Sequence, residues 1–169
     1  MENIEQFVTD NRESLTLFIN RYVRDITVAE EIAIDAFAEF FCSRRWNGTA
    51  SRRTYLFTIG RSRAIDHLRR EKRRAARTAP LEEGYTAEVS EDEIFAQVFR
   101  DERRRILEGA VAKLAPDMAA VVHLIYFEEM SYADAAAALR INRKRVDNLL
   151  YRAKAELKEI LGEEGRELL

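Results

Sequence analysis

Three consecutive cations near the C-terminus are the residues of this chain best suited to chemistry. Arg143, Lys144 and Arg145 follow Asn142, a favoured N-cap residue, and only residues 140–142 separate them from a preceding short helix. The second helix of a helix-turn-helix needs this arrangement, because the side chains of its first turns enter the major groove of DNA. We expect the following residues to contact duplex DNA: Arg143, Lys144, Arg145, Asn148 and Arg152.

The preceding short helix carries its own start signal. Ser131 followed by Asp134 is a capping-box pattern, and Met130 stands where a hydrophobic staple residue belongs. An amphipathic surface helix with solvated charges is the alternative, but two capped helices joined by so short a turn favour DNA binding. Apolar residues at spacings of three and four predict the buried face of the second helix: Val146, Leu149, Leu150, Ala153, Leu157 and Ile160.

A second basic region lies in the first half of the chain, although the formal net charge is only -2. Arginine and lysine dominate residues 44–77, where Asp66 and Glu71 are the only carboxylates, and an acidic stretch follows over residues 82–93. Trp46 and further aromatics stand among these cations. This composition suits the binding of single-stranded nucleic acid, because bases stack on aromatic side chains and cations follow the phosphates. Packing in a small core explains each aromatic equally well when it is taken singly.

Composition excludes several classes of protein. The 169 residues suffice for one domain or two small ones, and two prolines with six glycines favour long helices over a turn-rich β fold. Cys42 is the only cysteine, so no internal disulfide forms, and beside Phe40 and Phe41 we expect a buried, inert thiol in a reducing cytoplasm. The N-terminus does not read as a signal peptide, and no apolar run reaches the length of a membrane span.

Catalytic constellations are missing from the sequence. No glycine-rich phosphate loop and no cluster of histidine and cysteine at metal-ligand spacing is present. His67 stands in a basic stretch, and His123 lies in an apolar one, where we expect it to be a packed helix residue. We therefore predict no enzymatic activity, no catalytic residue, no metal and no cofactor.

The apolar periodicity predicts an all-α protein of two small helical domains joined by a flexible acidic linker. The first domain covers residues 1–77, the linker 78–93 and the second domain, which contains the helix-turn-helix, 94–169. Within the second domain we expect a break at Ala115-Pro116, followed by an apolar helix from Asp117 to Phe127.

Several segments, in their order along the chain, resemble a known family. Residues 29–37 read AEEIAIDAF, residues 55–70 read YLFTIGRSRAIDHLRR, residues 126–132 read YFEEMSY and residues 151–157 read YRAKAEL. Together with Leu114-Ala115-Pro116, they make nearly the whole chain similar to bacterial RNA polymerase sigma factors of the extracytoplasmic-function group. The resemblance implies two DNA-contacting helical domains, core RNA polymerase and promoter DNA as partners, an inhibitory anti-sigma protein, a cytoplasmic location and no membrane insertion.

The resemblance also implies roles for particular residues. The acidic face of the second helix would bind polymerase through Glu31, Asp35 and Glu39. The second domain would hold the upstream promoter element as duplex, and the loop after Trp46 would capture a flipped base of the opening downstream element. The downstream element would contact Trp46, Asn47, Gly48, Thr49, Ser51, Arg53, Ser62, Arg69 and Arg70.

Three positions depart from the family pattern. Ser62 replaces the usual Asn of the downstream site, and Asp147 stands where a Lys commonly approaches phosphate. Arg140 stands where the helix-turn-helix usually has Gly, so the left-handed conformation that Gly accepts would be strained or the turn altered. The promoter sequence therefore does not carry over from relatives.

Two other functions remain compatible with the residues. One is a free-standing helix-turn-helix transcriptional regulator with an N-terminal dimerisation or sensing domain. The other is a helical adaptor that binds only proteins and whose basic stretches are solvated surface. A regulator would shift promoter DNA alone, an adaptor never would, and a sigma factor would do so usefully only with polymerase.

Overall fold

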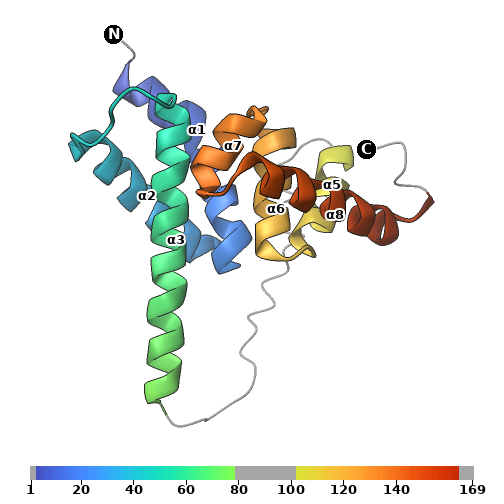
Figure 1. Cartoon of the computed structure of the whole chain (residues 1–169). Coiled ribbons are helices and arrows are strands. Elements are labelled where there is room, and N and C mark those ends of the chain that lie inside the picture. The colour runs from blue at the N-terminus through green and yellow to red at the C-terminus, as the bar shows by residue number, and fades with distance from the viewer. Residues whose placement is uncertain (1–2, 79–101, 164–169) are drawn as a thin grey trace.

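The computed structural model describes residues 3–78 and 102–163, and this part of the chain is helical, as the sequence predicts (Figure 1). Three helices form an N-terminal bundle: α1 (Ile4–Val23), α2 (Ile26–Cys42) and α3 (Arg52–Arg77). Each begins at a side chain that accepts a backbone N–H, namely Asn3, Asp25 and Ser51. The largest fully buried side chains of this bundle are Leu15, Phe18, Ile19, Leu56 and Phe57.

A C-terminal bundle contains the remaining described helices. They are α5 (Glu102–Ala112), α6 (Pro116–Val122), the π-helical turn η1 (His123–Phe127), α7 (Tyr132–Leu139) and α8 (Arg143–Leu161). The predicted break at Ala115-Pro116 is confirmed, because proline occupies the first position of α6, where its missing N–H is not needed. Residues 79–93 of the predicted linker and residues 94–101 of the predicted second domain lie outside the described residues.

The predicted helix over residues 117–127 changes its hydrogen bonding halfway along. The Glu128 N–H donates to the His123 carbonyl oxygen at 3.1 Å, which widens the last turn into a π turn. Glu129 then adopts a left-handed conformation with φ 53°, and the Met130 N–H donates to the Leu124 carbonyl oxygen at 2.9 Å. This irregular stretch sets the direction in which the chain enters α7.

The two bundles lie against each other. Helix α7 packs beside α3, and α6 contacts α1, while the C-terminal part of α3 extends beyond both bundles (Figure 1). The helix-turn-helix is therefore seated on the N-terminal bundle.

Two expectations about single side chains are wrong, and one is confirmed. Cys42 is exposed at the C-terminal end of α2, because the buried face of that helix passes through Phe37 and Phe40. Ile160 is 37% exposed, because it lies one turn beyond Leu157, the last buried residue of α8. His123 is buried, as expected of a packed residue.

Candidate nucleic-acid interface

The turn between α7 and α8 closes by backbone hydrogen bonds typical of a helix C-terminus. The Ile141 N–H donates to the Ala136 carbonyl oxygen at 3.0 Å, and the Arg140 N–H donates to the Ala137 carbonyl oxygen at 3.3 Å. This pair of bonds is the Schellman arrangement, which places a left-handed residue just after the helix. Arg140 holds that position with φ 53° and ψ 44°. The turn is therefore retained although Arg replaces the usual glycine.

Two side-chain caps fix the helices on either side of this turn. Ser131 accepts the Asp134 N–H at 3.0 Å, and its hydroxyl donates to the Asp134 carboxylate at 2.7 Å. Asn142 accepts the Arg145 N–H at 2.8 Å, as the sequence predicts. Both caps satisfy donors that a helix start otherwise leaves without partners.

Helix α8 separates an apolar face from a polar one. Its buried residues are Val146, Leu149, Leu150, Ala153 and Leu157. The five residues predicted to contact duplex DNA are all exposed and come from the first three turns of the helix: Arg143, Lys144, Arg145, Asn148 and Arg152. The helix is thus anchored along one side and presents cations and an amide on another.

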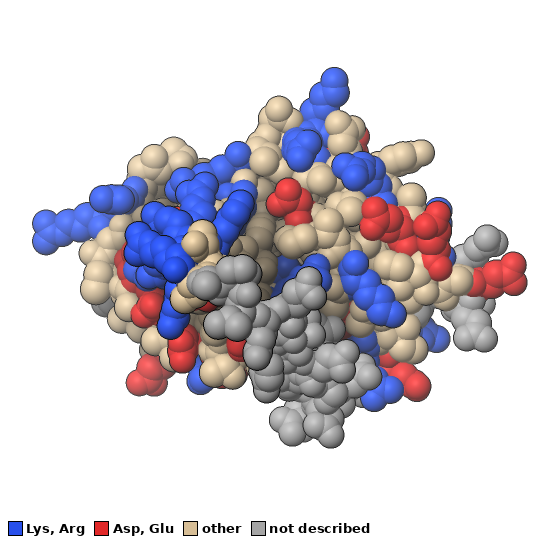
Figure 2. Space-filling view, turned by 90° about the horizontal axis from the view of Figure 1, so that it is seen from below, with Lys and Arg blue, Asp and Glu red and all other residues tan. Residues whose placement is uncertain are grey.

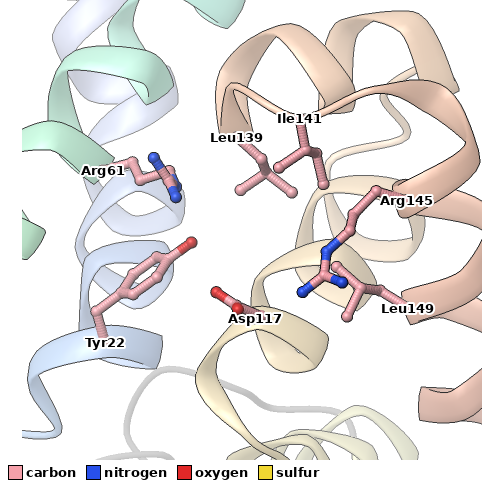
Figure 3. Close-up of a pocket in the computed structure, with 7 residues that line it drawn as sticks. All are labelled: Tyr22, Arg61, Asp117, Leu139, Ile141, Arg145 and Leu149. Atoms are coloured by element: carbon pink, nitrogen blue, oxygen red, sulfur yellow. The ribbon is translucent and has the colours of Figure 1, made fainter.

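Arg145 lies on the side of α8 that faces the N-terminal bundle. It lines a pocket with Tyr22 of α1, Arg61 of α3 and Asp117 of α6 (Figure 3). Burial raises the pKa of Tyr22 to about 12, although the positive charge of Arg61 acts in the opposite direction. This pocket places one residue of the proposed reading helix between the two bundles.

The loop between α2 and α3 is ordered by its own side chains. Asn47 Oδ1 accepts the Thr49 N–H at 3.1 Å and the Thr49 hydroxyl at 2.7 Å. Gly48 between them has φ 77°, a conformation that most residues resist. The Trp46 indole donates to the Ala50 carbonyl oxygen at 2.9 Å, and the residue remains 44% exposed. The loop therefore presents an aromatic surface held by hydrogen bonds at both ends.

Cations gather at the far end of α3. Figure 2 shows lysine and arginine side chains collected over the C-terminal part of this helix. The exposed cations of this segment, in sequence order, are Arg69, Arg70, Lys72, Arg73, Arg74 and Arg77. Such a row of charge follows a phosphate backbone without reading its sequence.

The other predicted downstream contacts have different surroundings. Ser51 is exposed as the N-cap of α3, where its hydroxyl accepts the Thr54 N–H at 3.0 Å. Ser62 is half-buried on α3. Arg53 is also half-buried, and its Nε donates to Asn11 Oδ1 at 3.0 Å. The remainder of the Arg53 guanidinium contacts Glu128 of the C-terminal bundle.

The predicted polymerase-binding residues lie on one side of α2. Glu31 and Asp35 are exposed and one helical turn apart, with the exposed Ile34 beside them. Glu39 accepts a hydrogen bond from Arg63 Nε at 2.8 Å, and Arg63 Nη1 lies 3.7 Å from the Asp35 carboxylate. These pairs are partly exposed and contribute little to stability, so both carboxylates remain accessible to a partner.

A polar network that the sequence did not suggest joins the two bundles. Arg21 of α1 forms an ion pair with Glu108 of α5, and its Nε lies 3.3 Å from His123 Nδ1. Arg53 of α3 forms an ion pair with the Glu128 carboxylate and donates to the Glu128 carbonyl oxygen at 2.9 Å. His123 Nε2 lies 2.9 Å from Glu128 Oε1. We call these five residues the interbundle network.

The protonation of His123 follows from its neighbours. Burial holds the pKa of His123 well below its ordinary value, and the charges of Arg21, Arg104 and Arg53 act in the same direction, against a backbone hydrogen bond at Ser14. A neutral imidazole carries one proton, and Arg21 can only donate, so Nδ1 accepts from Arg21 and Nε2 donates to the Glu128 carboxylate. His123 therefore connects the two ion pairs of the interbundle network.

Within residues 3–78 and 102–163, no group of three or more histidine, cysteine, aspartate or glutamate side chains is placed to hold a metal ion. In the same residues, no helix is long and apolar enough to cross a membrane.

Comparison with known proteins identifies both bundles. Residues 7–74 match the family described as "Sigma-70 region 2", and residues 104–157 match "Sigma-70, region 4". The RNA polymerase sigma-E factor of Streptomyces avermitilis is 30% identical over 164 residues, which cover 97% of this chain and 87% of that protein. The RNA polymerase sigma factor YlaC of Bacillus subtilis is 25% identical over 159 residues, which cover 94% of this chain and 91% of that protein.

Solved structures share the fold. The sigma factor RpoE of Bartonella quintana, in complex with the anti-sigma factor NepR, matches with a TM-score of 0.69 and 18% identity, over 93% of this chain and 95% of that chain. CnrH in complex with the cytosolic domain of CnrY matches with a TM-score of 0.60 and 22% identity, over 94% of this chain and 86% of that chain.

Proposed function

This chain belongs to the extracytoplasmic-function group of the sigma-70 family, and we propose that it directs core RNA polymerase to specific promoters and helps to open them. The observation that carries the proposal is the capped helix-turn-helix, whose second helix is anchored by an apolar face and opens on three exposed cations. The chain itself performs no chemical step in this role, because RNA synthesis belongs to the polymerase. It would act in the cytoplasm, where promoter DNA is available.

Helix α8 would read the upstream promoter element as duplex DNA. Arginine or lysine at the start of a groove-bound helix can donate two hydrogen bonds to guanine, which discriminates against other bases by about 1–3 kcal/mol. Lys144 and Arg145 occupy that position, and Asn148 follows one turn later on the exposed side. Arg152 lies further along the helix and would contact the DNA backbone.

The loop between α2 and α3 would act on the downstream element after the duplex opens. An exposed indole at Trp46 can stack on an extruded base, a contact worth about 1–3 kcal/mol. The hydrogen bonds between Asn47 and Thr49 hold the loop in one shape, so these residues would position the stacking surface as well as contact DNA. The cations at the end of α3, Arg69 and Arg70 among them, would follow the phosphates.

Polymerase binding would use the acidic side of α2. The exposed Ile34 lies beside Glu31 and Asp35, and an apolar side chain next to two carboxylates suits a partner surface that carries both cations and an apolar contact. An anti-sigma protein is the proposed inhibitory partner, because two chains of the same fold, RpoE and CnrH, were solved in complex with NepR and CnrY.

Transcription from a selected promoter tests the proposal. Promoters would first be selected from a random pool with core polymerase and this chain, and then transcribed with polymerase alone, the chain alone and both. Only the combination should bind the selected promoters tightly and produce transcripts. A shift of the same DNA by the chain alone would indicate a free-standing regulator, and no effect of the chain on polymerase would indicate an adaptor.

A pair of matched variants tests the reading helix within this assay. Lys144→Ala should relax base preference at the upstream element, whereas Lys158→Ala, which removes an exposed cation from the last turn of the same helix, should leave it unchanged. Binding to core polymerase should be the same for both variants. Unchanged base preference for Lys144→Ala and also for Arg145→Ala would show that α8 does not read sequence.

A further inference from the structure

We propose that the pocket between the two bundles is a binding site for inorganic phosphate. Its polar lining consists of Tyr22 of α1, Arg61 of α3, Asp117 of α6 and Arg145 of α8 (Figure 3). The inference goes beyond the proposed function, because phosphate binding to the free chain would require neither polymerase nor DNA.

Four polar side chains point into this pocket. Figure 3 shows the Tyr22 hydroxyl and the Arg61 guanidinium on one side, and the Asp117 carboxylate and the Arg145 guanidinium on the other. The hydroxyl and both guanidinium groups can donate hydrogen bonds, whereas an ionised carboxylate can only accept them. The pocket therefore has a surplus of positive charge and of donors, which suits a small anion.

Two donors of the N-terminal bundle lack an acceptor. Tyr22 is only 6% exposed, and within residues 3–78 and 102–163 neither its hydroxyl oxygen nor Arg61 Nε has a hydrogen-bond partner. Burial raises the pKa of Tyr22 to about 12, so the hydroxyl stays protonated near neutral pH and can donate. A buried donor without an acceptor is unfavourable, and most buried polar groups in folded proteins have a partner. An anion in the pocket would supply the acceptor for both groups.

The two guanidinium groups of the pocket are not engaged in ion pairs. Among the ion pairs of the described residues, none involves Arg61 or Arg145, whereas Arg63 on the same helix as Arg61 pairs with Glu39. An anion could therefore bind both groups without breaking an existing ion pair. Hydrogen bonds from arginine to phosphate are charge-assisted, and the planar guanidinium matches the spacing of the phosphate oxygens.

The pocket has the size of a small oxyanion. Its volume is about 80 Å³, whereas a single water molecule requires about 10–15 Å³ of such volume. Phosphate is a compact tetrahedral anion and fits within this space. The remaining lining residues are apolar: Leu139, Ile141 and Leu149. The oxygens of the anion would therefore be contacted by the four polar side chains.

The Asp117 carboxylate selects among small anions. It repels a fully deprotonated anion, but it can accept a hydrogen bond from a protonated oxygen. Near neutral pH, inorganic phosphate keeps at least one proton, whereas sulfate keeps none. A phosphate monoester, whose second pKa is about 6, is mostly a dianion without a proton, and a DNA phosphodiester has no proton to donate. Inorganic phosphate can therefore donate to Asp117 while its other oxygens accept from the three donor side chains.

Calorimetric titration of the full wild-type chain near neutral pH tests the site. Inorganic phosphate should bind saturably, with one equivalent per chain. Sulfate and glycerol phosphate are the comparison anions, each at the same ionic strength. Both should bind at least about tenfold more weakly, because each loses the charge-assisted hydrogen bond to Asp117.

Matched variants assign the binding to the pocket. Tyr22→Phe removes only the hydroxyl and should weaken phosphate binding about tenfold, whereas Tyr126→Phe, at an exposed tyrosine that does not line the pocket, should leave it unchanged. Asp117→Asn should raise the affinity for sulfate to nearly that for phosphate, because an amide N–H can donate to a deprotonated oxygen. Far-ultraviolet circular dichroism checks that the helices persist. If Tyr22→Phe loses helicity, Asp117→Asn still tests the site, because Asp117 is exposed.

Any of the following results would overturn the inference. The wild-type chain shows no saturable binding of phosphate, or it binds sulfate as tightly as phosphate. A helical Tyr22→Phe variant keeps the wild-type affinity for phosphate, or Asp117→Asn keeps the wild-type preference for phosphate over sulfate. The proposed function fails separately, through the absence of promoter-dependent transcription by the wild-type chain with core polymerase, and that assay needs no added phosphate.

Discussion

The substitution Arg140→Gly should stabilise the C-terminal bundle without changing promoter preference. Arg140 is the left-handed residue of the Schellman turn between α7 and α8, with φ 53°, and its side chain is exposed. A residue with a Cβ atom is strained in this conformation, whereas glycine adopts it readily. The backbone hydrogen bonds of Ile141 and of residue 140 would remain, because they involve no side chain.

Two opposing contributions set the size of the effect. The left-handed conformation costs a residue other than glycine about 1–2 kcal/mol. Glycine gives the unfolded chain more freedom, which opposes folding by about 0.4–1 kcal/mol. The net expectation is a gain of about 0.5–1 kcal/mol in the free energy of unfolding. For a bundle the size of residues 102–163, this corresponds to a rise in Tm of roughly 2–8 °C.

Urea unfolding followed by circular dichroism measures this gain. One further variant expected to be more stable and one expected to be less stable serve as comparisons. Glu129→Gly relieves the same conformation at φ 53° and should also stabilise, whereas Ala137→Gly, at an exposed position inside α7, should lose about 1 kcal/mol. The reasoning is refuted if Arg140→Gly destabilises the chain as much as Ala137→Gly does. Such a result would mean that the arginine side chain stabilises the turn by more than its backbone strain costs.

Three further changes test other parts of the molecule. Gly60→Ala should destabilise the N-terminal bundle by about 1 kcal/mol in urea unfolding, because the new Cβ would lie 2.8 Å from Leu15 Cδ1 in a closed core; unchanged stability would show that Leu15 can move. Asp35→Lys should weaken binding to core polymerase in a pull-down at moderate salt without loss of helicity, and wild-type affinity would remove α2 from the proposed interface. Lowering the pH from 7.5 to 5.5 should reduce the free energy of unfolding by about 1.4 kcal/mol, because burial depresses the pKa of His123 and only the unfolded chain binds the proton as the pH falls below about 6.5. His123→Gln should remove this part of the pH dependence, and an equal loss in that variant would assign it to other groups.

The sequence predicted those parts of the fold that local interactions determine. Ser131 and Asn142 are short polar residues directly before apolar periodic stretches, and both accept the backbone N–H groups that a helix start exposes. Pro116 ends one helix and begins another for the same local reason. Capping and periodicity depend on residues within one or two turns, so they can be read without knowledge of the tertiary structure.

Side-chain surroundings were less predictable. Cys42 follows two phenylalanines, yet it is exposed, because α2 ends there and only one side of its last turn faces the core. The π turn at His123 likewise has no local signal, because the apolar residues around it would suit a regular helix equally well. Each outcome depends on which elements pack against the segment, and that information lies elsewhere in the chain.

Arg53 shows why a charged residue could not be given one role from sequence. In a basic, aromatic stretch its charge predicts a phosphate contact, and the structure gives it a carboxylate that is 75 residues away. A phosphate and a carboxylate can both accept hydrogen bonds from the five N–H donors of a guanidinium, so the residue type alone does not predict which of them Arg53 contacts. In the structure Arg53 meets the carboxylate because the C-terminal bundle places Glu128 beside it, and that placement is determined by residues far from Arg53 in the sequence.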